Sequence, residues 1–147
     1  MPRHLAFILL LLLTPIVAMS AHAQQSERFG PYEVHYSVVN STFLSPEISA
    51  QYGIARGKTR AILNLAVREH QADGATLARP AELQGRTWDL FQNQFFEFQE
   101  IREGEAIYYI GEFKFSDKEL RFFDVLILPE GASRSYQLRF QHKVYVE

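Results

Sequence analysis

The sequence predicts an all-β fold, a seven-stranded antiparallel sandwich of the immunoglobulin or fibronectin kind with one short helix between its first two strands. Successive runs alternate apolar and polar residues, which is the period of a half-buried strand. Turn residues separate these runs, and no helical pattern exceeds about two turns. A closed barrel is the alternative arrangement of the same strands.

A predicted secretory leader precedes the sandwich. The 147-residue chain begins with a basic residue at Arg3, an apolar run at 5–13 and an A-x-A cleavage site at 21–23. The apolar run is shorter than the ~20 residues that span a bilayer. We therefore expect cleavage after Ala23, no transmembrane segment in the exported protein, and a single β-sandwich domain over 24–147.

The predicted strands follow one another with short connections. Gly85 interrupts the third strand, E-G-E at 103–105 is a hairpin turn, and the run at 120–128 is apolar on both faces, which places it in the middle of a sheet. Residues 23–29, AQQSERF, are expected to be a loose terminus. The predicted strands are 32–38, 61–67, 83–90, 95–102, 106–115, 120–128 and 136–146.

The first strand leads into a capped corner. Asn40 and Thr42 continue its inward face, so we expect them to end it by bonding nearby backbone groups in an Asx-type turn. A short helix should follow, with Ser45 as N-cap, Pro46 at the first position and Gly53 past the end. Such a helix is too short to be stable alone and must dock, with Ile48 and Tyr52 as its expected contacts.

A small basic patch follows the corner. Arg56, Lys58 and Arg60 are spaced by two, so an extended backbone would place all three on one outward face of the second strand. One interpretation is charge that protects an edge strand from unwanted pairing. The other is a site for an anion or an acidic partner.

The segment "FGPYEVHYSVVNSTFLSPEISAQYGIARGK" and the following "AILNLAV" resemble a family of small secreted proteobacterial proteins known only as a domain of unknown function. The resemblance covers most of the exported chain and is densest over residues 29–67. It implies a Gram-negative periplasm. It implies no activity and no catalytic or binding residues.

Composition and motifs argue against catalysis. The chain has no cysteine, which excludes disulfides and lipid attachment at a cysteine, and its net charge of −2 becomes −3 without Arg3, so general binding to nucleic acid or anionic membranes is not expected. No nucleophile elbow, phosphate loop or metal-binding spacing occurs. His35 and His70 are far apart in sequence, and His142 is expected to be a hydrogen-bonded core residue. We expect no enzyme activity and no cofactor.

Aromatic residues offer a further candidate surface. Tyr108 and Ile110 lie opposite the inward positions of their strand, and Trp88 lies beside Gly85. Aromatic side chains are enriched at interface hot spots, so a patch of Trp88 and Tyr108 would be a recognition surface. The alternative is a central strand with both faces covered.

Three functions remain open from the sequence. The first is a non-catalytic module that binds another envelope protein or assists envelope assembly, with Asn40, Tyr52, Trp88, Tyr108 and the basic patch as candidate binding residues. The second is a carrier of a small ligand or metal, which requires the histidines and glutamates to converge in the fold. The third, a hydrolase, requires two perturbed titratable groups in one cleft.

Overall fold

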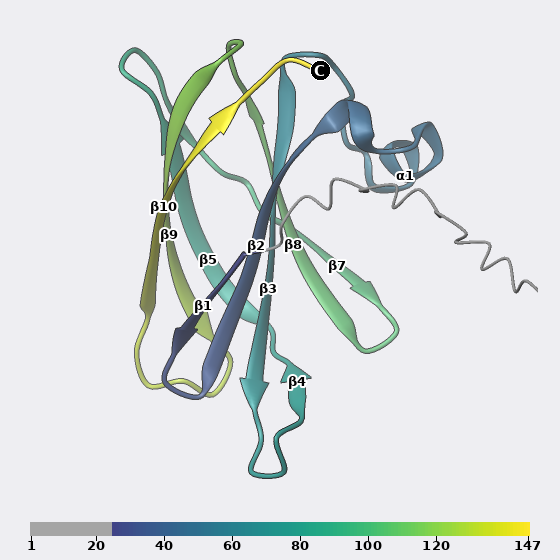
Figure 1. Cartoon of the computed structure of the whole chain (residues 1–147). Helices are drawn as coiled ribbons and strands as arrows, with labels where there is room; N and C mark the ends of the chain where they lie inside the picture. The colour runs from purple at the N-terminus through teal and green to yellow at the C-terminus, as the bar shows by residue number, and fades with distance from the viewer. Residues whose placement is uncertain (1–24) are drawn as a thin grey trace, which may run out of the picture.

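Two antiparallel β-sheets, packed face to face, form the protein (Figure 1). The computed structural model describes residues 25–147, so the predicted leader lies outside the described residues. Within the described range, the helices are too short to traverse a bilayer. The all-β prediction is confirmed. The predicted count of seven strands is wrong, because residues 25–147 contain ten.

The larger sheet has six strands in the order β1-β2-β3-β8-β7, with β4 paired to the end of β3. The short helical segments η1 (Ser41–Phe43) and α1 (Pro46–Tyr52) lie between β2 and β3. The strands of this sheet are β1 (Gln25–Phe29), β2 (Tyr32–Asn40), β3 (Arg60–His70), β4 (Thr76–Ala78), β7 (Gln99–Glu103) and β8 (Ala106–Lys114).

The smaller sheet has four strands in the order β10-β9-β5-β6. Its central strand β9 is the run that is apolar on both faces, as predicted. The strands of this sheet are β5 (Ala81–Trp88), β6 (Asn93–Phe95), β9 (Glu119–Pro129) and β10 (Tyr136–Val144).

Three strands were not predicted, namely β1, β4 and β6. The expected loose terminus is instead β1, which pairs with β2 along its whole length and places Phe29 against Tyr136, with ring centroids 5.4 Å apart. Only the second half of the predicted strand at 95–102 is a strand, β7, because residues 96–98 cross the sandwich from β6 in the other sheet.

An aromatic core joins the sheets at this crossing. Phe96 is buried and stacks on Phe123, which stacks in turn on Phe140 with centroids 4.6 Å apart. Gly111 of β8 leaves room for the Phe96 ring, since a Cβ there would lie 2.6 Å from a ring carbon. The crossing segment is thus fixed by side chains of both sheets.

The capped corner is confirmed in its local details. Ser45 Oγ accepts the Ile48 amide at 3.2 Å, Pro46 begins α1, and Gly53 ends it with a left-handed φ of 66°. The predicted docking pair is wrong, because Ile48 is 41% exposed and Ile54, just beyond the helix, is buried in its place. A polar contact also docks the helix, since the Tyr52 hydroxyl donates to Glu103 of β7.

Ser41 closes the base of this corner, and its loss is expected to destabilise the fold. The Ser41 hydroxyl is fully buried, accepts the Gly57 amide at 2.9 Å and donates to the Gly57 carbonyl at 3.0 Å. Ser41→Ala would leave both backbone groups without these bonds, so we expect a loss of about 1–3 kcal/mol in the free energy of unfolding, measured in urea. Thr42→Ala is the control, because Thr42 bonds Arg56 through its carbonyl. Equal losses in the two variants would contradict this role.

Candidate functional site

The basic patch does not lie on one strand face. Arg56 and Lys58 precede β3 in a loop that turns at Gly57, and Arg60 is the first residue of the strand. The Arg56 guanidinium donates to the Thr42 carbonyl at 3.2 Å, within the corner. The interpretation as edge protection is wrong, because β3 lies between β2 and β8 inside its sheet.

Asn40 and Tyr52 hold the corner in place. The Asn40 amide nitrogen donates to the Tyr145 carbonyl at 2.6 Å and so ties the end of β2 to the last residues of the chain. The expected local Asx-type turn is therefore wrong for Asn40. The hydrogen bond from Tyr52 to Glu103 raises the pKa of the Tyr52 hydroxyl, followed by smaller effects of burial and of the Glu103 charge.

Trp88 and Tyr108 do not form one patch. Trp88 ends β5 in the four-stranded sheet, whereas Tyr108 lies on β8 in the six-stranded sheet, between the buried residues Ile107 and Tyr109. Trp88 instead pairs in register with Phe122 of β9, and their rings stack at 5.7 Å with an interplanar angle of 20°. The neighbours of Trp88 therefore come from β6 and β9.

These neighbours lie on the outside of the four-stranded sheet, where the register pair Arg86 and Asp124 separates the stacked rings from Leu126. Phe95 of β6 lies opposite Arg86 and is 71% exposed, and Leu126 of β9 is 43% exposed. The Arg86 guanidinium lies 4.5 Å from the centre of the Trp88 ring, a cation–π contact. We call this surface the aromatic face; its members are Trp88, Phe95, Phe122 and Leu126.

The aromatic face accounts for the apolar residues on the outer side of β9. One face of this strand contributes Phe123 and Val125 to the core, and the other presents Phe122 and Leu126. A strand that is apolar on both faces is ordinarily covered on both. Among residues 25–147, no helix or strand covers the outer face of this sheet (Figure 1).

Shallow hollows surround Arg86 and Trp88 on this face. One of about 430 Å³ is lined by residues that include Arg86, Phe95 and Leu126. A second, of about 290 Å³, lies between Trp88, Phe122 and the β10 residues 139–141. A third, of about 330 Å³, runs from Arg86 along the loop to β6.

The loop between β5 and β6 projects two apolar side chains beyond the sheet. Leu90 and Phe91, which we call the tip, are each 90% exposed. Asp89 fixes the loop, because its Oδ1 accepts the amides of Phe91 at 2.7 Å and Gln92 at 2.6 Å. The Asp89 amide donates to the Gln92 carbonyl at 3.0 Å. The exposed tip is thus carried by a well-bonded turn.

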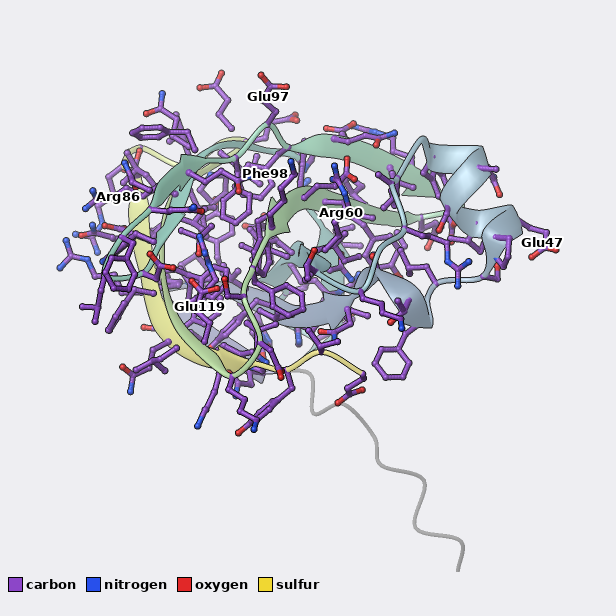
Figure 2. All side chains as sticks on the ribbon, turned by 90° about the horizontal axis from the view of Figure 1, so that it is seen from above. Glu47, Arg60, Arg86, Glu97, Phe98 and Glu119 are labelled. Atoms are coloured by element: carbon purple, nitrogen blue, oxygen red, sulfur yellow. The ribbon has the colours of Figure 1, made fainter. Side chains whose placement is uncertain are left out.

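A buried charged cluster supports this loop from inside. Arg121 of β9 is 1% exposed, and its guanidinium donates to Glu119 Oε1 at 2.8 Å and to Thr87 Oγ1 at 3.0 Å. It also lies 3.9 Å from Asp89 Oδ2. Figure 2 shows Glu119 turned toward the interior and Arg86 on the outside of the sandwich.

Asp89 and Glu119, the carboxyl pair, have pKa values shifted in opposite directions. Burial, followed by the hydrogen bond to Asp89, raises the pKa of Glu119. The same hydrogen bond, followed by the amides of Phe91 and Gln92, lowers the pKa of Asp89 to about 2. Two neighbouring carboxyls whose pKa values are shifted in opposite directions are a pattern seen in acid–base catalysis.

The oxygens of the carboxyl pair are nevertheless engaged by the protein. Asp89 Oδ1 accepts two loop amides, Glu119 Oε1 accepts Arg121, and Glu119 Oε2 accepts the Ser116 amide at 2.6 Å. Each of these bonds holds a loop or a strand end. The carboxyl pair supplies the two titratable groups with shifted pKa values that a hydrolase requires. Its hydrogen bonds, however, are those of side chains that support the structure.

Of the three histidines within residues 25–147, two converge and the third lies on the other sheet. His70 Nε2 lies 2.7 Å from Glu33 Oε2, and His35 Nε2 lies 3.7 Å from Glu33 Oε1. The hydrogen bond with His70 is the largest cause that lowers the Glu33 pKa. His142 lies opposite Arg121 in the register of β10 and β9. Over residues 25–147, no group of three or more histidines and carboxylates is arranged to hold a metal ion.

Sequence and structure comparisons find related proteins. The family model of a domain of unknown function, DUF4426, matches residues 26–147. The crystal structure of a DUF4426 family protein from Pseudomonas aeruginosa PAO1 matches with a TM-score of 0.72 and 28% identity, over 84% of this chain and 96% of that one. No curated protein matches the sequence.

Two further solved structures share the fold at low identity. FetP of uropathogenic Escherichia coli strain F11, recombinantly expressed in the periplasm of E. coli BL21(DE3), has a TM-score of 0.61 and 10% identity over 84% of this chain and 94% of that one. A copper-bound variant of FetP has a TM-score of 0.60 and 11% identity over 84% and 95%. At this identity the likeness concerns the fold.

Proposed function

Because the chain belongs to the DUF4426 family of domains of unknown function, we propose its function from its own surface: a non-catalytic periplasmic module that binds another envelope protein through the aromatic face. The observation that carries this proposal is the second apolar face of β9, which no described element covers. The predicted leader and the periplasmic expression of FetP, which shares the fold, support the compartment.

The residue types of the aromatic face suit protein recognition. Tryptophan and arginine dominate interface hot spots, and here Arg86 and Trp88 already contact each other. The exposed Phe95 would gain about 1.5–3 kcal/mol on full burial by a partner. The rigid sheet below means that little ordering entropy opposes binding. The aromatic face therefore has the chemistry and the rigidity of a docking surface.

Site-directed cross-linking in cells tests this proposal. A photo-reactive residue at Asn93, which is exposed on β6, should capture one envelope protein reproducibly, identified by mass spectrometry. Phe95→Ser/Leu126→Ser should reduce the captured amount at least about tenfold, because two buried apolar contacts are lost. The matched control is Ile48→Ser/Leu77→Ser, which changes apolar residues of 41% and 47% exposure on the other sheet and its corner. Retention of the partner in the first variant, or equal loss in both, would refute the aromatic face as the site.

The basic patch is a secondary proposal for the same role. Lys58 and Arg56 are exposed beside the corner, although Arg56 already bonds Thr42. Arg56→Glu/Lys58→Glu enters the same cross-linking series. Loss of the partner in this variant alone would move the site to the corner.

A second candidate function is a metal or small-ligand carrier. The observation that favours it is the convergence of His35 and His70 on Glu33, in a fold shared with copper-bound FetP. Imidazole and carboxylate are ligands that copper and zinc accept. Stoichiometric copper binding by calorimetry, lost in His70→Ala, would support the carrier function over the docking function.

A further inference from the structure

We propose that the tip, Leu90 and Phe91, inserts into the lipid surface of a membrane and holds the protein beside it. This inference goes beyond the proposed docking function and starts from the tip, which is not part of the aromatic face, although Arg86 and Trp88 lie beside both. It rests on the exposure of the tip, on the bonding of its backbone and on the residues behind it.

The tip is convex and unusually apolar. Leu90 and Phe91 are adjacent and each is 90% exposed, and the loop 89–92 that carries them extends past the end of the four-stranded sheet (Figure 1). A protein partner would need a pocket shaped to two side chains, whereas a bilayer accepts a convex apolar tip without a matching shape. The small area and the convex form thus favour lipid.

Three backbone amides around the tip are bonded within the loop. Backbone amides that enter lipid without a partner carry a large cost. Asp89 Oδ1 accepts the Phe91 and Gln92 amides, and the Asp89 amide is bonded to the Gln92 carbonyl. The Asp89 side chain is only 15% exposed, and its other oxygen faces Arg121. The loop therefore presents apolar side chains and keeps its charge inside.

The residues behind the tip match the layers of a membrane surface. Trp88 is the last residue of β5 before the loop, and Arg86 lies ~7 Å further from the tip along the strand, at ~3.3 Å per residue. Peripheral apolar segments enter the boundary between headgroups and acyl chains by about 5–10 Å. Trp88 would then lie at the interface, where tryptophan is enriched, and Arg86 would lie at the level of the phosphates.

The expected attachment is weak and reversible. Two apolar side chains bury less surface than one acyl chain, and a single acyl chain gives only marginal membrane binding. The net charge of the exported chain is negative, so general attraction to anionic lipid does not add to it. Phe95 lies opposite Arg86 and therefore reaches the level of the phosphates, whereas Leu126, opposite Gln84, lies further from the tip and leaves that part of the aromatic face free for a protein partner.

Vesicle binding followed by tryptophan fluorescence tests the proposal, because Trp88 is the only tryptophan of the chain. The probe is a vesicle of phosphatidylethanolamine with a minor share of phosphatidylglycerol, and the protein is the exported, leader-cleaved form checked by mass spectrometry. Vesicles should shift Trp88 emission to shorter wavelength, and lipids brominated near the headgroup should quench it. Leu90→Ser/Phe91→Ser should lower the partition coefficient at least about tenfold.

The controls separate tip insertion from other causes of binding. Ile48→Ser/Leu77→Ser should partition like the wild type, and added salt should change binding little, since the contact is apolar. Unchanged Trp88 emission with vesicles would overturn the proposal, as would equal binding of the tip variant or binding abolished by salt. Capture of a protein at the tip, with Trp88 unaffected by vesicles, would also overturn it. Urea unfolding verifies that the tip variant is folded, which we expect because both replaced side chains are exposed.

Discussion

Replacement of Arg121 by alanine is expected to lower the free energy of unfolding by about 3–5 kcal/mol. Arg121 is 1% exposed and donates to both Glu119 and Thr87, so its removal leaves a buried carboxyl and a buried hydroxyl without their donor. Urea unfolding at neutral pH, followed by Trp88 fluorescence and circular dichroism, measures the loss.

The pH dependence of this loss has a definite sign. Burial already raises the folded-state pKa of Glu119, so its stabilising contribution is present at low pH and is lost as the pH rises through that pKa. Without the Arg121 charge this pKa rises further, and the variant should therefore lose more stability as the pH increases. A loss that shrinks with rising pH would contradict the assigned pairing.

Arg139→Ala is the matched control for Arg121. The Arg139 side chain is 68% exposed, and its Nε lies 3.4 Å from Asp124 on the surface. Exposed ion pairs contribute at most about 1 kcal/mol. A similar loss in the Arg121 and Arg139 variants would show that burial of Arg121 does not decide its contribution.

Gly111→Val is expected to cost about 3 kcal/mol, the second largest effect, because it overpacks the aromatic core. A Cβ at Gly111 would lie 2.6 Å from Phe96 and 3.1 Å from Phe98, and both rings belong to the segment that crosses between the sheets. Phe96 cannot retreat, since it also stacks on Phe123. Thermal and urea unfolding measure the loss.

A second substitution tests whether Phe96 causes this effect. Phe96→Leu in the Gly111→Val background should recover part of the stability, seen as a coupling energy in a double-mutant cycle. Gly57→Ala is the control glycine, because its Cβ would meet only the flexible Arg60 side chain, at 3.3 Å. Additive losses at 96 and 111 would contradict a direct clash.

Local signals in the sequence were sufficient to predict the helix of the corner and the central position of β9 in its sheet. Ser45, Pro46 and Gly53 act on their own helix, so their meaning does not depend on the rest of the fold. The apolar run of β9 correctly predicted a central strand, whereas its uncovered outer face depends on how many layers the protein has. Phe95 and Phe96 were predicted to lie on one strand. Phe95 instead ends β6 with its side chain exposed, and Phe96 enters the core where the chain leaves the four-stranded sheet.

The candidate site was predicted only in part, for the same physical reason. Trp88 and Tyr108 were predicted to share one aromatic surface; Trp88 stacks on Phe122 in the four-stranded sheet, but Tyr108 belongs to the other sheet, and sheet membership is not a local property. From the sequence, Leu90 was assigned to the end of the predicted strand at 83–90, and Phe91 to the loop that follows it. The turn residues Asp89 and Asn93 on either side of this apolar pair were the signal that could have revealed an exposed tip.

The path of the chain through the two sheets determines how the protein must fold. The chain builds β1 to β4 in one sheet, passes to the other for β5 and β6, returns for β7 and β8, and ends with β9 and β10. The pairing of β3 with β8 therefore waits until much of the second sheet has been synthesised. Neither sheet is an autonomous folding unit, and such non-local pairing is typical of domains that fold in roughly milliseconds to seconds. Until β8 arrives, the open edge of β3 is a site for misassembly or for a chaperone, so a nick in the connections between β3 and β8 should impair both sheets together.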